Sequence, residues 1–437
     1  MGGDETSMSL TLIRNVQIVS PLGLEETDIL IADETFAAIG RNLRRPIAAE
    51  VVEAKGLLAL PGLIDIHAHL REPGGEHKED FYTGTQAALA GGVTTVLAMP
   101  NTQPPITDEA SLQAALNLAA KKAVCDFGVF LGATPDNHKT AQHVQGAVGL
   151  KMYMGSSTGN LLVNRFEDQY AHLAAYPNNR VVAVHAENEE AVRYFAEHQQ
   201  RRPPLCANLE TSRAILIAES LGRSVHICHL STAREIQTVK EARQRGVKVT
   251  CEVTPHHLFL SSGIESHLGA LGQMNPPLRS EADVAALWDN LHFVDAIATD
   301  HAPHTLEEKN SPTPPSGVPG LETMLPLLLT AVQQRQLGLA ELMRLTAIGP
   351  AKLFCLDRKG AIAPGYDADL VLVNLETQWT LSASNLLTRC GWTPFDGWRV
   401  RGKVEQVYTR GRLAFANGQV LAKRGAGRQV QQTWRKA

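Results

Sequence analysis

Two histidines and an arginine follow one apolar run near the start of the chain. The run extends over residues 58–66, and His67, His69 and Arg71 come directly after it. In an extended strand alternate side chains share a face, so the two imidazoles project from the same side. They could bind one metal ion, while the guanidinium is suited to holding an anionic substrate nearby. Taken alone, the two histidines are explained equally well as surface polar residues.

The apolar pattern that precedes these residues repeats along the chain. Continuous rather than alternating hydrophobicity is typical of strands that are buried on both faces, and helix-length segments lie between the runs. We therefore predict an α/β fold, a (β/α)₈ TIM-type barrel. The predicted strands are 57–70, 93–100, 127–132, 148–154, 181–185, 225–229, 247–253 and 294–300, and predicted helices include 79–90, 108–122, 210–220, 232–245 and 281–291.

Both ends of the chain have a different pattern. Short strands are predicted at 10–19, 27–31, 36–39, 370–375 and 404–420, separated by turn-forming Gly, Pro, Asn and Asp. We expect a small β-sandwich domain formed from both chain termini, residues 1–56 plus 362–437, with the barrel over 57–361. The segment 303–319, rich in Pro, Ser and Glu, is predicted to be a long loop after the eighth strand, and a loop of this length is usually functional or mobile.

Composition excludes some classes of function. The 437 residues carry 41 Lys and Arg against 45 Asp and Glu, a net charge of −4, so nothing favours a nucleic-acid or membrane-surface partner. No apolar stretch approaches the roughly 20 residues that span a bilayer. The six cysteines are scattered without a CxxC pair, which indicates a reduced, cytoplasmic protein.

Polar residues end most of the predicted strands, and in this fold the carboxyl ends of the strands form the active site. Each residue taken alone has an explanation without a function, since Asn101 suits a turn and the side chain of Lys151 could reach solvent. Together they favour a two-metal hydrolytic centre, in which imidazole and carboxylate ligands bind zinc and a bridging hydroxide is the nucleophile. The set is His67, His69, Asn101, Lys151, His185, His229 and Asp300.

Eight motifs occur in order between residues 61 and 323, and together they resemble the dihydroorotases of the amidohydrolase superfamily, in particular a bacterial type I-like branch. The first reads PGLIDIHAHLREPG, and Pro364–Leu370 resembles the family's return to the β domain. The motifs cover 61–74, 99–102, 149–153, 184–187, 226–229, 274–279, 299–304 and 319–323.

The resemblance implies a site, a reaction and a cofactor. The reaction is the reversible cyclisation of N-carbamoyl-L-aspartate to L-dihydroorotate and water, in pyrimidine synthesis. Asp300 would take the proton from the bridging hydroxide and deliver it to the departing ring nitrogen. Two Zn²⁺ ions would be bridged by a carboxylated Lys151. The first would be held by His67, His69, Lys151 and Asp300, and the second by Lys151, His185 and His229; Arg71, Asn101 and His304 would bind the substrate carboxylate, and Asn275 the pyrimidine ring.

Other expectations from the resemblance leave alternatives open. A third metal near Cys228 and Glu252 is one, although Cys228 suits a core and Glu252 suits orienting a ligand histidine. The loop 155–160 is expected to cover the substrate rather than only connect two elements. Rival functions are allantoinase, dihydropyrimidinase, and a metal-free scaffold homologue. Expected partners are a small-molecule substrate, a second copy in a homodimer, and aspartate transcarbamoylase.

Overall fold

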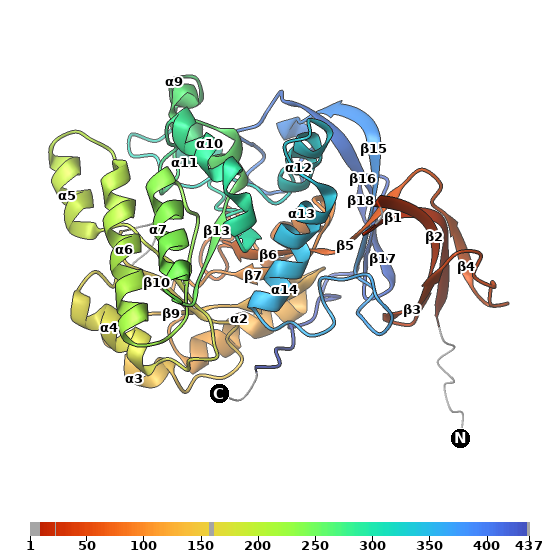
Figure 1. The fold of residues 1–437 in the computed structure, drawn as a ribbon, viewed down its shortest axis with the longest axis horizontal. Helices are drawn as coiled ribbons and strands as arrows, with labels where there is room; N and C mark the ends of the chain where they lie inside the picture. The colour runs from red at the N-terminus through yellow and green to blue at the C-terminus, as the bar shows by residue number, and fades with distance from the viewer. Residues whose placement is uncertain (1–8, 22, 157–160, 435–437) are drawn as a thin grey trace.

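The computed structural model describes residues 9–21, 23–156 and 161–434. Most of the predicted substrate-covering loop, residues 157–160, therefore lies outside the described residues. The described chain forms a barrel of parallel strands surrounded by helices, with a large sheet at one side (Figure 1). No helix among the described residues combines the length and apolar character needed to cross a membrane.

The barrel consists of parallel strands in eight consecutive positions around a closed ring. Two sheets, β6-β7-β8 and β9 to β14, pair in sequence order. The amide of His69 donates to the carbonyl of His301 at 2.7 Å, which joins the first position to the last. The predicted (β/α)₈ fold class is therefore confirmed. The strands are β6 (Leu63–Ala68), β7 (Val93–Ala98), β8 (Asp126–Val129) with β9 (Leu131–Gly132), β10 (Leu150–Tyr153), β11 (Val182–His185), β12 (Val225–Ile227), β13 (Val249–Val253) and β14 (Ala296–Ile297).

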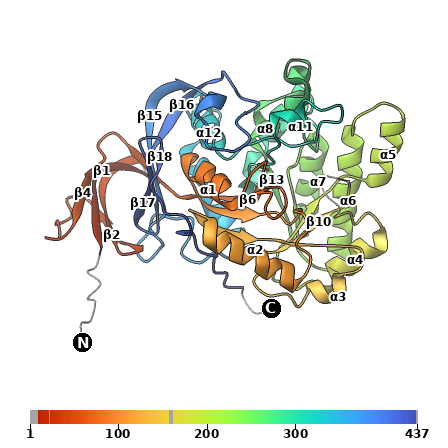
Figure 2. The same ribbon diagram turned by 180° about the vertical axis from the view of Figure 1, so that it is seen from behind.

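Helices between the strands cover the outside of the barrel (Figures 1 and 2). Several begin at capping boxes, in which Asp80, Asp108 or Thr232 accepts a hydrogen bond from a first-turn amide. The longest begins at Pro204, six residues before the predicted start, because proline suits the first helical position. The main helices are α1 (Phe81–Ala90), α2 (Glu109–Lys122), α4 (Phe166–Ala175), α5 (Glu189–Glu197), α6 (Pro204–Ser220), α7 (Ala233–Gln244), α10 (Glu281–Asp289) and α12 (Met324–Gln333), with the short α11 (Leu306–Lys309) after β14.

Both termini contribute to one nine-stranded sheet. Strands from the start of the chain lie beside strands from its end, at the side of the barrel away from α4 to α6 (Figures 1 and 2). The predicted domain limits of 1–56 plus 362–437 and 57–361 remain a prediction. The strands are β1 (Leu10–Ser20), β2 (Gly23–Ala32), β3 (Thr35–Gly40), β4 (Glu50–Glu53), β5 (Leu58–Pro61), β15 (Leu370–Thr380), β16 (Arg399–Thr409), β17 (Arg412–Ala416) and β18 (Gln419–Val420).

The apolar run predicted as one strand over 57–70 forms two strands in different sheets. β5 pairs with β1 and β15 in the terminal sheet, and β6 begins the barrel. Gly62 separates them, where the chain passes so close to its neighbours that an added Cβ would lie 2.2 Å from Thr94 Oγ1. The first barrel strand, which carries the two histidines, therefore follows directly on a strand of the terminal sheet.

Candidate metal centre and substrate pocket

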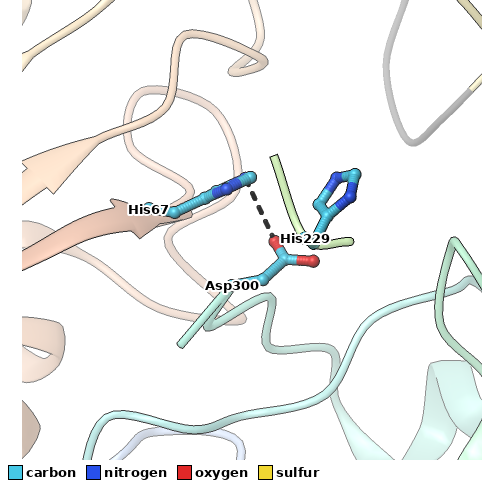
Figure 3. Close-up of side chains that lie close together, drawn as sticks. All are labelled: His67, His229 and Asp300. Atoms are coloured by element: carbon cyan, nitrogen blue, oxygen red, sulfur yellow. Dashed lines mark ion pairs between the residues drawn. The ribbon is translucent and has the colours of Figure 1, made fainter. Parts of the chain in front are cut away.

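The carboxyl ends of five barrel strands bring six candidate ligands together in the interior. All six residues are buried, none more than 8% exposed. Figure 3 shows three of them, His67 at the end of β6 and His229 and Asp300 beyond β12 and β14, pointing toward one another. The six are His67, His69, Lys151, His185, His229 and Asp300, all of which the sequence predicted as metal ligands.

One group of donor atoms converges on Asp300. Its Oδ1 lies 3.3 Å from Nε2 of His67 and 3.0 Å from Nε2 of His69. Burial opposes ionisation of this carboxyl, but the two imidazoles, His67 foremost, hold its pKa well below the usual range. An ionised carboxylate and two imidazole nitrogens at these distances match the donor set of a zinc site.

A second group surrounds Lys151, whose amine is fully buried. Its Nζ lies 3.4 Å from Nε2 of His67 and donates to Sγ of Cys228 at 3.0 Å. On the next two strands, Nδ1 of His185 lies 3.0 Å from Nε2 of His229. Lys151 thus lies beside His67, and its charge also acts on His185 and His229.

The far nitrogen of three ligand histidines is held by an acceptor. His67 donates from Nδ1 to Glu252, His69 from Nδ1 to Asn101 Oδ1 at 2.6 Å, and His185 from Nε2 to Glu187 at 3.1 Å. With those protons in place, the neutral rings of His69 and His185 direct their lone pairs at the other ligand atoms. Lone pairs and a carboxylate facing one another repel unless a cation lies between them.

The pKa values of the imidazoles fit this conclusion. Burial lowers the pKa of His69 to about 4 and lowers that of His185 and, further, of His229, so these rings are neutral and able to bind a metal. Burial and Lys151 act in the same direction on His67, but Glu252 and Asp300 outweigh them and raise its pKa to about 10. The centre attracts positive charge, and the described residues fit a bound metal ion.

Two glutamates, Glu187 and Glu252, accept hydrogen bonds from ligand histidines, and only Glu252 is a sequence-based prediction. Glu252 was expected either to orient a histidine or to bind a third metal, and both of its oxygens accept from histidines, Oε2 from Nε2 of His226 at 3.0 Å. Donor atoms of His67, Cys228 and Glu252 also lie within 4.8 Å of one another. The orienting role of Glu187 is visible only in the structure, although its position two residues after His185 is a sequence signal that could have indicated it.

A small pocket lies beside the ligand group around Asp300. Three of the four predicted substrate-binding residues line it, Arg71, Asn101 and Asn275. The fourth, His304, is not among the lining residues and contacts Arg71, with its Nε2 3.1 Å from Nη2 of the guanidinium. The lining residues are His69, Arg71, Asn101, Asn275, Asp300, Ala302, Ser316 and Gly317.

Three site residues adopt left-handed backbone conformations that favour glycine. Arg71, His229 and Asp300 have φ values of 61°, 37° and 45°. Such conformations are strained in residues with side chains and persist where the surroundings enforce them. The strain lies at the turns that direct these side chains into the centre.

The sequence matches the amidohydrolase family over residues 58–414. The chain belongs to the amidohydrolase family. It is 37% identical to a dihydroorotase of Methanosarcina acetivorans over 95% of this chain and 94% of that one, which places this amidohydrolase with the dihydroorotases.

Two further comparisons define the neighbourhood of this amidohydrolase. A segment of the multifunctional protein CAD of Squalus acanthias is 44% identical over 86% of the chain, which spans only 16% of that protein's length. Among solved structures, an L-hydantoinase (dihydropyrimidinase) of Arthrobacter aurescens superposes with a TM-score of 0.92 at 28% identity, covering 97% of this chain and 99% of that one. The fold is thus shared with an enzyme whose name differs from those of the two sequence relatives.

Proposed function

We propose that this amidohydrolase is a dihydroorotase that catalyses the reversible cyclisation of N-carbamoyl-L-aspartate to L-dihydroorotate and water in pyrimidine biosynthesis. One observation carries the proposal: the pocket beside Asp300 is lined by the buried guanidinium of Arg71. A planar, bidentate donor of this kind suits a carboxylate. A carboxylate on the ring distinguishes dihydroorotate from uncharged cyclic amides.

The remaining lining residues fit the same substrate. Arg71, Asn101 and His304 would bind the carboxylate, and Asn275 would contact the ring. Oδ1 of Asn275 is buried and has no hydrogen-bond partner among the described residues, so an N–H of the substrate would satisfy it. Asn101 already accepts a hydrogen bond from His69. The residue that orients this metal-ligand histidine therefore also lines the substrate pocket.

The metal centre that we propose contains two Zn²⁺ ions. Bound there, they would supply Lewis acidity and lower the pKa of water in the site. His67, His69, Lys151 and Asp300 would hold one ion, and Lys151, His185 and His229 the other. Lys151 cannot ligate as an ammonium, so we propose that it is carboxylated, giving one oxygen to each ion.

Asp300 is the proposed general base and acid. Its carboxylate is ionised and lines the pocket, so it can accept a proton from the attacking water. In hydrolysis it then donates that proton to the ring nitrogen as the amide bond breaks, and in cyclisation the transfers run in reverse. A third ion at Cys228 and Glu252 is a weaker proposal, because both oxygens of Glu252 already accept hydrogen bonds.

Allantoinase and dihydropyrimidinase are the rival enzymes, and the hydantoinase neighbour shares the scaffold. Purified protein should be assayed spectrophotometrically with dihydroorotate, allantoin and dihydrouracil under identical conditions. We expect turnover of dihydroorotate to exceed that of the other two by at least about 100-fold, because only its ring carboxylate uses the buried guanidinium. Faster turnover of dihydrouracil would refute the proposal, and no turnover of any substrate would favour the scaffold homologue.

We further propose a cytoplasmic location, a homodimer, and association with aspartate transcarbamoylase. The six cysteines form no disulfide among the described residues, which suits a reducing compartment. In the multifunctional relative the matching segment is part of a far longer chain, which supports association with partner enzymes. Sedimentation with and without the transcarbamoylase tests both assemblies.

A further inference from the structure

His304 lies between two cationic side chains. Nζ of Lys78 is 3.3 Å from its Nδ1, and an Nη2 of Arg71 is 3.1 Å from its Nε2. The ring is fully buried. Burial first, and then Arg71 and Lys78, hold the pKa of His304 far below its usual range, so the ring is neutral and carries one N–H.

The contacts with Lys78 and with the carbonyl oxygen of Ser316 together favour the proton on one nitrogen. An ammonium only donates, so Lys78 favours a lone pair on Nδ1 and the proton on Nε2, whereas the guanidinium of Arg71, equally unable to accept, favours the reverse. Nε2 lies 3.1 Å from the carbonyl oxygen of Ser316, a suitable acceptor in the pocket wall. The proton is thereby directed toward the pocket side of the ring.

A carboxylate of the chain itself competes for the other tautomer. Oε2 of Glu308 lies 3.5 Å from Nδ1 of His304, close enough to attract a proton on that nitrogen. Lys78 opposes this, because its ammonium binds Oε1 of Glu308 at 2.9 Å and occupies Nδ1 at the same time. His77 also contacts Oε1 of Glu308, at 3.3 Å, but no described contact joins it to His304.

The resulting tautomer creates an anion site. With the proton on Nε2, N–H donors of His304 and Arg71 lie 3.1 Å apart, and neither can accept from the other. An anion that accepts from both relieves this conflict, and a substrate carboxylate has two oxygens for the purpose. With the proton on Nδ1, the lone pair of Nε2 would accept from Arg71 and repel that carboxylate.

We propose that Lys78 is a positioning residue that keeps the Nε2–H tautomer of His304, so that His304 and Arg71 together donate to the substrate carboxylate. The proposal rests on the proposed function only for the identity of the substrate. Lys78 contacts His304 and Glu308, which are neither predicted metal ligands nor residues that line the pocket, and it acts through the ring of His304.

The test compares Lys78→Met with Lys78→Arg and with the control His77→Gln, which alters another contact of Glu308 from a largely exposed position. For Lys78→Met we expect KM for dihydroorotate to rise about 10- to 100-fold, the range for losing one hydrogen bond to a charged group, with kcat within about threefold of the unaltered enzyme. Lys78→Arg restores a donor-only cation and should recover most of the affinity. His77→Gln should leave KM unchanged.

A spectroscopic readout separates the tautomer from a general loss of structure. In protein labelled with ¹⁵N-histidine, ring shifts assigned with a His304→Gln variant should report protonated Nε2 in the unaltered protein and in Lys78→Arg, and protonated Nδ1 in Lys78→Met. An unchanged tautomer in Lys78→Met, or an unchanged KM, overturns the proposal. The ring shifts are measured without substrate, so they test the tautomer even if dihydroorotate proves not to be the substrate.

Discussion

Glu322 offers a test of the electrostatics at the junction between the barrel and the segment before β16. Its carboxylate accepts from the amides of Leu387 and Thr388 at 2.9–3.0 Å, and Glu79 lies nearby. Burial raises the pKa of Glu322 from 4.5 to about 7, and the like charge of Glu79 adds to the increase. The folded protein therefore favours the neutral form of this side chain.

The direction of the pH effect follows from proton binding. Between about pH 4.5 and 7 the folded state binds more protons than the unfolded state, so stability falls as pH rises through this window. Above pH 7 the ionised Glu322 lowers the free energy of unfolding by at most about 3 kcal/mol, the equivalent of the difference between the two pKa values. Glu322→Gln removes this cost, and its amide oxygen can still accept from both backbone amides.

The expected shift can be measured by thermal unfolding. For 437 residues the entropy of unfolding is about 0.9 kcal/mol per kelvin, so Glu322→Gln should raise Tm by about 3 °C at pH 8.5. At pH 5.0 the gain should be below about 1 °C, because the folded side chain is still protonated there and pH 5.0 lies only about half a unit above the unfolded pKa of 4.5. Glu376→Gln, at a side chain 77% exposed, is the control and should change Tm little at either pH. An equal gain at both pH values, or a loss at pH 8.5, would refute the reasoning.

The remaining predictions concern the centre itself. Purified protein should contain about two zinc ions per chain by mass spectrometry of metals, and chelation should abolish turnover; metal-free protein with undiminished activity contradicts the two-metal proposal. Asp300→Asn should retain metal and lose activity by about 1,000-fold, and near-normal rates would remove Asp300 from proton transfer. Lys151→Ala should lose the metal pair and recover partial activity with added acetate or propionate, whereas no recovery would argue against a bridging carboxylate. Arg71→Gln should raise KM for dihydroorotate by about 100-fold in steady-state assays, and an unchanged KM would exclude Arg71 from carboxylate binding.

Much of the fold could be predicted from the chain because its signals are local. A strand buried on both faces needs a continuous apolar run, and a capping residue such as Asp108 acts within one helical turn. The division of the run over 57–70 could not be predicted in this way. It depends on Gly62 meeting Thr94 and on β15, more than 300 residues away, pairing with β5.

The sequence by itself determined the residue types at the strand ends, because in a parallel barrel the carboxyl end of every strand reaches the same rim. His67, Lys151 and Asp300 could therefore be placed together before any contact was known. Only the tertiary structure decided which nitrogen of each histidine faces the centre, because its proton is held by an acceptor from another strand or loop, as Glu252 holds that of His67. For the same reason, the part that Lys78 plays at His304, 226 residues away, became visible only in the folded chain.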